Sequence, residues 1–325
     1  MQQPHRAIAQ AGINVALIKY WGKRDAELNL PAVSSLSLTL DAPGTRTEVI
    51  FDSALSHHQF QLNGVEADAG RVQPILDAVR QHAGSHGIPL PHARVNSENT
   101  VPTAAGLASS ASGFAALVAA AWAAAGLDPE DPHKAELTRI GSGSAPRSLL
   151  GGFVVLDKVE GQIRQIATPE AWPLRMVLCL TEKGPKKISS RVGMESSART
   201  SPYFASWVSS HEADMQAAEA AINARDLDTL GEMMEHSTLK MHACMMAGRP
   251  PLIYWRSATL AAMEQVHQLR EQGVSAWYTM DAGPHVKVLC AAEDAEHIAS
   301  TLKAVPGVSE VLVAAPGPGA QVETC

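Results

Sequence analysis

The sequence predicts an α+β protein of two domains. A chain of 325 residues can bury a sizeable core, and chains of this length commonly divide into more than one domain. Short apolar or alternating segments, typical of strands, are interspersed with longer helical segments. Near the C-terminus the predicted order is strand, strand, helix, strand, which is typical of an α+β layer. We place the boundary after an apolar strand at residues 174–181, which gives domains of residues 1–182 and 183–325.

Composition and charge exclude several classes of protein. Charged residues make up 18% and hydrophobic residues 46% of the chain, which favours a soluble globular protein over a disordered one. The formal net charge of −7, without a basic block, argues against a nucleic-acid partner. The N-terminus lacks the apolar core of a signal peptide, and the longest apolar run, residues 114–127, is too short to span a bilayer. We therefore expect no membrane association and a cytoplasmic location.

Cysteine and histidine spacing predicts neither a disulfide framework nor a zinc site. The four cysteines are widely spaced and form no C-x-x-C motif, which fits reduced thiols in the cytoplasm. The thirteen histidines form no H-E-x-x-H motif. Four histidines lie in polar or helical stretches, where we expect solvated or packed rings: His57, His58, His236 and His242.

A lysine directly follows the first predicted strand. Residues 13–18 form an apolar run suited to a buried strand, and Lys19 comes next, before a turn that carries Lys23 and Arg24. A solvated turn explains the last two cations. Lys19 is expected to be partly desolvated, so it needs an anionic partner or a shifted pKa.

The other elements of the first domain follow from alternation and turn signals. Residues 35–40 alternate with period two, as a half-buried strand does. Residues 45–51 and 58–62 are expected to pair as strands, and Asn63-Gly64 is a strong turn signal before Val65. The remaining predicted elements are a helix at residues 71–86, strands at 92–97 and 153–156, and a turn at 128–132 that starts a new helix.

The rest of the chain is organised around a loop of small residues at 102–113 (PTAAGLASSASG), which leads into an alanine-rich helix. Gly106 permits unusual backbone angles, and serine hydroxyls fall where the first helical N–H groups lack partners. Such a loop lets a phosphate approach the backbone, and the helix dipole favours its charge. A tightly packed helix start without a ligand would have the same composition, and no lysine follows as in the G-x-x-x-x-G-K-[ST] motif.

A second glycine- and serine-rich segment carries an arginine. Residues 141–147 (GSGSAPR) offer N–H and hydroxyl donors, and Arg147 adds a planar fork suited to a carboxylate or phosphate. A flexible loop before a strand is the alternative. A second phosphate-type loop in the same chain favours an anion site.

The second domain is predicted to hold three helices and an α+β layer. A basic serine-bearing segment, residues 183–191, would by itself be a solvated loop. Asp281 ends a strand before a Gly-Pro turn, where an aspartate alone would simply bond its own backbone. The predicted helices are residues 206–225, 226–247, 254–272 and 294–303, the strands are 276–280, 286–290 and 308–313, and the tail at 316–319 is expected to be loose.

Together these motifs resemble the diphosphomevalonate decarboxylases of the GHMP small-molecule kinase superfamily. The resemblance is carried, in family order, by residues 14–25 (NVALIKYWGKRD), 102–112, 141–147, 189–194 (SSRVGM) and 280–284 (MDAGP). The KYWGK run separates this branch from the sugar and mevalonate kinases. Two departures are His285, where the family commonly has asparagine, and Pro146, where it has a small residue. Either would alter local anion contacts.

The resemblance implies a fold and a reaction. The expected fold has a ribosomal-protein-S5-like N-terminal domain and a ferredoxin-like C-terminal domain, with the active site in the cleft. The implied reaction is ATP-dependent decarboxylation of (R)-5-diphosphomevalonate to isopentenyl diphosphate in isoprenoid synthesis, with Mg²⁺ and a homodimer as further expectations.

The resemblance also implies roles for individual residues. Asp281 would orient the substrate hydroxyl and accept its proton, Lys19 would stabilise charge beside it, and Arg147 would hold the carboxylate. The residues that match diphosphate-binding positions are Tyr20, Lys23, Ser142, Ser144 and Ser190. Those expected to bind ATP are Ser97 and Asn99 near the base, and Gly106, Leu107, Ala108, Ser109, Ser110 and Ser112 at the phosphates, with Ser109 or Ser110 near Mg²⁺.

Three alternatives stay open from the sequence. A decarboxylase of 5-phosphomevalonate, giving isopentenyl phosphate, would use the same motifs, although Lys23, Ser142 and Ser144 favour two phosphates. A GHMP kinase that stops at the phosphate ester would not need Arg147 to hold a carboxylate. A non-catalytic binding protein would not need Lys19 and Asp281.

Overall fold

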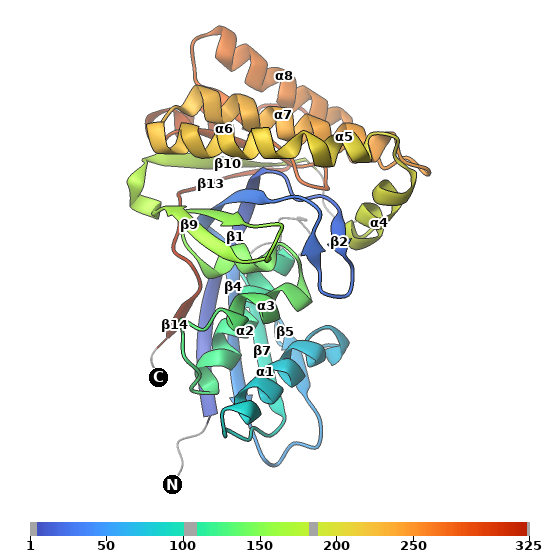
Figure 1. Ribbon diagram of the computed structural model, residues 1–325. Coiled ribbons are helices and arrows are strands. Elements are labelled where there is room, and N and C mark those ends of the chain that lie inside the picture. Colours follow the sequence, from blue (N-terminus) through green and yellow to red (C-terminus); the bar gives the residue numbers. More distant parts are fainter. Residues whose placement is uncertain (1–4, 101–108, 182–187, 324–325) are drawn as a thin grey trace.

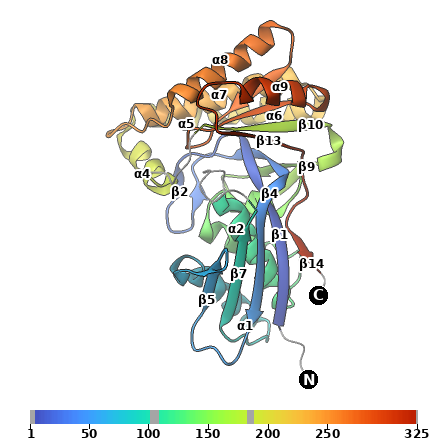
Figure 2. The same ribbon diagram turned by 180° about the vertical axis from the view of Figure 1, so that it is seen from behind.

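The computed structural model describes residues 5–100, 109–181 and 188–323 (Figure 1). Two sheets dominate it. One takes up the lower part of the molecule in Figure 1 with helices α1 to α3, and the other lies at the upper end with helices α5 to α8. Seen from behind, helix α9 covers that second sheet (Figure 2). Among the described residues, no helix has the length and apolar character needed to cross a membrane.

The first sheet is built on two long strands. Strand β1 (His5–Ile18) pairs antiparallel with β4 (Ser35–Phe51), so the segments predicted as separate strands at 35–40 and 45–51 form one element. The order is β14-β1-β4-β7-β5-β6, and β8 pairs with both β4 and β9. The other bounds are β5 (Gln59–Leu62), β6 (Val65–Glu66), β7 (Ala93–Asn99), β8 (Phe153–Leu156), β9 (Ile163–Ala167) and β14 (Gln321–Glu323).

The predicted pairing of residues 45–51 with 58–62 is wrong. Strand β7 lies between β4 and β5, and β5 pairs with it in parallel, as in the register of Phe60 with Val95. Insertion of β7 pairs Val49 with Val95, and both are buried. The predicted turn is confirmed, because Asn63 and Gly64 both have the positive φ that a type I′ hairpin requires.

Three helices pack on the first sheet. They are α1 (Gln73–Ser85), α2 (Ser109–Ala124) and α3 (His133–Gly141), close to the predicted positions. Ala115 and Ala116 of α2 pack against Ala11 of β1, and all three are buried. Small side chains let the helix approach the sheet closely, which places the start of α2 beside the end of the sheet where the functional residues gather.

The second sheet has the order β11-β12-β10-β13. Its strands alternate between two cores: Met176 and Leu178 of β10 face helices α6 and α7, whereas Val177 and Cys179 face α8 and α9. The bounds are β10 (Leu174–Leu180), β11 (Ala276–Thr279), β12 (Val286–Ala291), β13 (Glu310–Ala314), α6 (His211–Ala224), α7 (Leu227–Met246), α8 (Ser257–Glu271) and α9 (Ala295–Lys303). The predicted strand, strand, helix, strand order is confirmed, and β10, which precedes the predicted boundary at 182, belongs to this sheet.

Several predictions for this half are corrected. Helix α4 (Ser190–Thr200) begins within the segment that we expected to be a loop, because Ser189 caps it by accepting the N–H of Val192. The predicted helix at 206–225 is divided into α5 (Phe204–Ser209) and α6 at Ser210. The tail at 316–319 is not loose. The N–H of Gly317 donates to the Thr39 carbonyl, and β14 then pairs with β1.

Candidate active site

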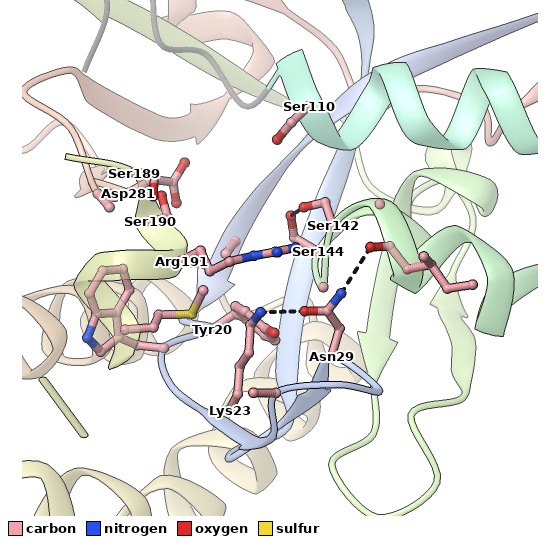
Figure 3. A pocket seen from close by; sticks show the side chains of 18 of the residues that line it. Tyr20, Lys23, Asn29, Ser110, Ser142, Ser144, Ser189, Ser190, Arg191 and Asp281 are labelled. Carbon is pink, nitrogen blue, oxygen red and sulfur yellow. Dashed lines mark hydrogen bonds between the residues drawn. The ribbon is translucent and has the colours of Figure 1, made fainter. Parts of the chain in front are cut away.

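A cavity of about 1180 Å³ lies between the two sheets. Its walls come from the end of β1, the short hairpin of β2 (Lys23–Asp25) and β3 (Leu30–Pro31), the segment before η2 (Ala145–Leu149), the starts of α2 and α4, and the turn after β11. Figure 3 shows the polar side chains that point into it. The predicted residues that line it are Lys19, Tyr20, Lys23, Ser110, Ser142, Ser144, Arg147, Ser190 and Asp281.

Two lysines hold one carboxylate in this cavity. Lys19 Nζ lies 2.9 Å from Asp281 Oδ1, and Lys287 Nζ bonds Asp281 Oδ2. Both lysines are at most 3% exposed, whereas Asp281 is 30% exposed and faces the cavity. The anionic partner that the sequence required for Lys19 is therefore Asp281, from the other half of the chain.

The local folds of β1 and β11 set this arrangement. The Lys19 N–H donates to Ser237 Oγ of α7 at 3.0 Å, and Nζ donates to the Ala16 carbonyl at 2.8 Å. Thr279 Oγ1, at the end of β11, donates to the same carbonyl at 3.3 Å. These bonds join the end of β1 to the strand that leads into Asp281.

Burial and charge shift the pKa values of this cluster. Burial is the main cause that lowers the pKa of Lys19 to about 8; Asp281 opposes this shift and Lys287 adds to it. For Asp281, burial opposes ionisation, but the charges of Lys19 and Lys287 outweigh it and hold the pKa of the carboxyl well below its usual range. Asp281 is thus ionised at neutral pH, with an oxygen available to a substrate.

Arg147 is buried and held by neutral partners. Its Nη1 donates to Ser35 Oγ at 2.5 Å and its Nη2 donates to Asn14 Oδ1 at 3.0 Å. Asn14 is itself oriented by donating to Ser148 Oγ at 2.8 Å. Among the described residues Arg147 forms no ion pair, its Nε has no hydrogen-bond partner, and burial lowers its pKa to about 10. A guanidinium that forms no ion pair in a cavity wall is suited to bind a carboxylate or phosphate.

A second group of polar side chains in the cavity surrounds Tyr20 and Lys23. The Tyr20 hydroxyl has no hydrogen-bond partner among the described residues, and burial raises its pKa to about 12. Lys23 bonds Asn29 Oδ1, and burial together with nearby Arg191 lowers the pKa of Lys23 (Figure 3). Ser142 Oγ lies 3.3 Å from Ser144 Oγ. These donors form a second anion-binding region in the same cavity.

The start of helix α4 completes that region. Ser189, Ser190 and Arg191 all line the cavity. A helix N-terminus presents N–H groups and the positive end of the dipole, so it favours an anion. The segment that we expected to be an ordinary solvated loop therefore contributes a helix start to the site.

The predicted nucleotide-binding residues are only partly described. Gly106, Leu107 and Ala108 lie outside the described residues, as does the side chain of Ser109. Ser110, on the first turn of α2, points into the cavity (Figure 3). Three residues lie outside the cavity lining: Ser112 and Asn99 each bond Thr45 Oγ1 at 2.9 Å, and Ser97 lies 2.9 Å from Thr47 Oγ1. Their predicted contacts with ATP stay predictions.

The two departures from the family pattern have structural roles outside the cavity lining. His285 is buried, and its Nδ1 accepts the N–H of Thr181 at 3.2 Å. Thr181 Oγ1 donates to the Pro284 carbonyl at 2.8 Å, so the turn after Asp281 is fastened to the end of β10. Pro146 is buried at the start of η2, where proline is favoured. His242 is packed as predicted: it is 1% exposed, and burial lowers its pKa to about 3.

Sequence reasoning missed several residues of the site. Lys287 had a weak signal as a lysine inside an apolar strand, where charge needs a partner. Asn14 and Ser35 had none, because their role depends on the distant Arg147. The missed residues are Asn14, Asn29, Ser35, Ser189, Arg191 and Lys287.

The arrangement combines three chemical capacities in one cavity. An ionised carboxylate between two lysines orients a hydroxyl and neutralises charge on a transferring group. A lone guanidinium holds a second anionic group, and the Tyr20 and α4 region holds a third. The oxygen donors of Ser110 and Asp281 are of the kind that Mg²⁺ prefers.

Comparisons with known proteins agree over most of the chain. Residues 11–166 match the family model described as the diphosphomevalonate decarboxylase-like N-terminal domain. Residues 176–315 match the mevalonate 5-diphosphate decarboxylase C-terminal domain. The diphosphomevalonate decarboxylase of Aspergillus fumigatus is 35% identical in an alignment 331 residues long, gaps included, which covers 93% of this chain and 81% of the relative.

Solved structures of similar proteins superpose closely. The crystal structure of mevalonate diphosphate decarboxylase from Staphylococcus aureus has a TM-score of 0.91 at 35% identity and covers 99% of each chain. Another structure, in complex with MVAPP, AMPPCP and magnesium, has a TM-score of 0.90 at 39% identity and covers 99% of this chain and 100% of that one.

Proposed function

The chain belongs to the diphosphomevalonate decarboxylase family, and we propose that it converts (R)-5-diphosphomevalonate and ATP to isopentenyl diphosphate, ADP, phosphate and carbon dioxide. Its two-sheet α+β structure is the two-domain fold of the GHMP kinase superfamily. The observation that carries the proposal is the meeting of Asp281, Lys19 and Arg147 in one cavity, with the buried Lys287 paired to Asp281.

The first step that we propose is phosphorylation of the tertiary alcohol. A tertiary hydroxyl is a poor leaving group, and transfer of the γ-phosphoryl group of ATP turns it into a good one. Asp281 accepts the hydrogen bond of the hydroxyl and orients its oxygen toward phosphorus. Because the lysines make Asp281 a weak base, it takes the proton late, once the forming O–P bond has made the hydroxyl more acidic. Lys19 stabilises charge on the transferred group.

The second step is loss of phosphate and carbon dioxide. Departure of phosphate leaves the tertiary carbon short of electrons, and the breaking bond to the carboxylate supplies the pair that forms the double bond. We assign Arg147 to the carboxylate, which it holds in line with the leaving group. Ser35 and Asn14 occupy two arms of the guanidinium without neutralising its charge, so the charge is available to the substrate.

The diphosphate fits the polar region around Tyr20 and Lys23. We assign its oxygens to donors that share the cavity wall around the β2–β3 hairpin and the start of α4: Tyr20, Lys23, Ser142, Ser144 and Ser190. Asn29 holds Lys23 in place by accepting its hydrogen bond. The extra cation Arg191 favours a group with two phosphates over one.

ATP and Mg²⁺ belong to the same proposal. Similar proteins have been solved with AMPPCP and magnesium. We assign the ATP phosphates to the segment around Gly106 and to the start of α2, the base to the neighbourhood of Ser97 and Asn99, and Mg²⁺ to the hydroxyl of Ser110. Ser110 fits this role because its side chain is exposed to the cavity on the first turn of a helix. The ion neutralises phosphate charge during transfer.

One experiment tests the function against its alternatives. The protein is mixed with Mg-ATP and either mevalonate, its 5-phosphate or its 5-diphosphate, and ADP and carbon dioxide are measured separately. We expect equal amounts of both products with the diphosphate alone. Turnover of the 5-phosphate instead would indicate an enzyme that forms isopentenyl phosphate. Formation of ADP without carbon dioxide would indicate a kinase, and the absence of any product would indicate a binding protein.

The family resemblance and composition support two further expectations: a cytoplasmic location and a homodimer. Because β10 belongs to the second sheet, we propose a domain boundary before Leu174 in place of residue 182. Light scattering of the purified chain measures the oligomeric state. A mass of one chain would contradict the homodimer.

A further inference from the structure

A cluster of histidines around one aspartate lies away from the active site. His82 and His86 lie one turn apart at the end of α1, Asp131 lies in the connection from α2 to α3, and His133 begins α3. Pro74, in the first turn of α1, lines the cavity. At a rise of 1.5 Å per residue, His86 lies about 18 Å from Pro74 along the axis of this helix. The catalytic mechanism uses none of these four residues.

The ligand atoms of three of these side chains converge. One atom each from His82, His86 and Asp131 lies within 4.8 Å of the other two. His82 Nε2 lies 2.9 Å from Asp131 Oδ2. Ligand atoms around a tetrahedral zinc ion, with bonds of about 2.1 Å, are separated by about 3.4 Å. A bound ion would replace the hydrogen bond between His82 and Asp131 and would draw the exposed His86 ring toward them.

Neighbouring groups orient the ligands in the way found around metal sites. His86 Nδ1 lies 2.9 Å from the His82 carbonyl, which can only accept, so Nδ1 carries the proton and Nε2 keeps its lone pair. His133 donates to Asp131 Oδ1 from its ring at 2.8 Å and from its backbone N–H at 2.9 Å. This leaves Oδ2 directed to His82. Hydrogen bonds of this kind fix the tautomer and direction of metal ligands.

Trp122 of α2 holds the residues of the cluster in place by contacting both segments that carry them. Its ring stacks on His82, with centroids 4.9 Å apart and planes at 28°, and its Nε1 donates to the Asp128 carbonyl at 2.7 Å. One buried tryptophan therefore supports both the helix that carries the histidines and the loop that carries Asp131. That loop also contains Asp128 and Glu130, whose charges attract a cation.

We propose that His82, His86 and Asp131 form a binding site for a divalent transition-metal ion of the zinc class, with water completing the coordination. Two imidazole nitrogens and one carboxylate suit Zn²⁺, whereas Mg²⁺ prefers oxygen ligands alone. The bound ion links the end of α1 to the connection between α2 and α3, and so stabilises the wall of the first domain behind the active site.

The test is a titration with zinc chloride in excess Mg²⁺, so that oxygen sites are already occupied. All proteins carry Cys325→Ser, which removes the terminal thiol as a zinc ligand. Calorimetry measures affinity, and the midpoint of thermal unfolding measures stabilisation by the bound ion. His86→Gln removes an exposed ligand, and His297→Gln, an exposed histidine on α9, is the matched control.

We expect one zinc ion per chain, a zinc-dependent rise in the unfolding midpoint, and at least tenfold weaker binding in His86→Gln and in Asp131→Asn. His297→Gln should bind like the parent, and ADP formation without zinc should be the same in all four proteins. Equal zinc affinity in His86→Gln and the parent, or no effect of zinc on the parent's unfolding, would overturn the proposal.

Discussion

Lys287 of β12 bonds the Oδ2 oxygen of Asp281, which lies in the turn after the neighbouring strand β11. Lys287 lies on the face of β12 that turns away from the α8 and α9 core, where Val286 and Val288 are packed. With Lys19 on Oδ1, Asp281 has a cation on each oxygen. Two cations against one anion leave a net positive charge, which attracts a transferring phosphoryl group.

This charge balance predicts the pH dependence of turnover. Lys19 acts in its protonated form, and its pKa is lowered to about 8, so its charge is lost as pH rises through that value. We expect kcat/KM to fall above about pH 8. Asp281 stays ionised across the neutral range, so its titration adds no acidic limb there.

Lys287→Met tests the cause of the expected fall in kcat/KM at alkaline pH, the alkaline limb of the profile. Because Lys287 is one of the charges that lower the pKa of Lys19, its removal should move the alkaline limb to higher pH. Lys303→Met, at an exposed position on α9, should leave the profile unchanged. A limb at the same pH in Lys287→Met would show that Lys287 does not act on Lys19.

Asp281→Asn should reduce turnover by about 10²- to 10⁴-fold, because the amide neither carries the charge that orients the hydroxyl nor accepts its proton. The substrate and ATP should still bind, since the anion donors of the cavity are untouched. The measurements are ADP release and binding by calorimetry. Near-normal turnover would remove Asp281 from the reaction.

Arg147→Gln should reduce carbon dioxide release by about 10²-fold or more, because the carboxylate is no longer held in line with the leaving group. Arg164→Gln, an exposed arginine that pairs with Glu219, is the control and should release carbon dioxide at the normal rate. The assay follows carbon dioxide and ADP together. An unchanged rate in Arg147→Gln would place the carboxylate elsewhere.

Gly143→Ala should raise the KM for the diphosphate substrate, about tenfold, and leave thermal stability nearly unchanged. A Cβ at this position would overlap the Tyr20 hydroxyl, so the ring must leave its place in the cavity wall. Gly84→Ala, on an open face of α1, meets no atom within 4 Å and is expected to stabilise the chain by about 0.5–1 kcal/mol. Steady-state kinetics and thermal unfolding of both variants would separate the change in KM from the change in stability. An unchanged KM in Gly143→Ala would exclude Tyr20 from substrate binding.

Local patterns identified most strands and helices but not their partners. The alternation at residues 35–40 and the turn at Asn63-Gly64 are local properties, and both are present in the structure. The predicted pairing of residues 45–51 with residues 58–62 was wrong because β7, more than 40 residues later in the chain, pairs with this part of β4. Helix α4 was missed because its start is polar, and its stability depends on packing of Met194 against Trp21 and Met241.

The sequence by itself determined that this is a two-domain α+β decarboxylase, because its motifs, strand periodicity and turn residues are local and can be recognised without neighbours. Only the tertiary structure decided that Asp281 lies between Lys19 and Lys287, and that Arg147 has neutral partners. Electrostatic interaction depends on distance and burial, and residues 262 positions apart, as Lys19 and Asp281 are, acquire both only when the chain has folded.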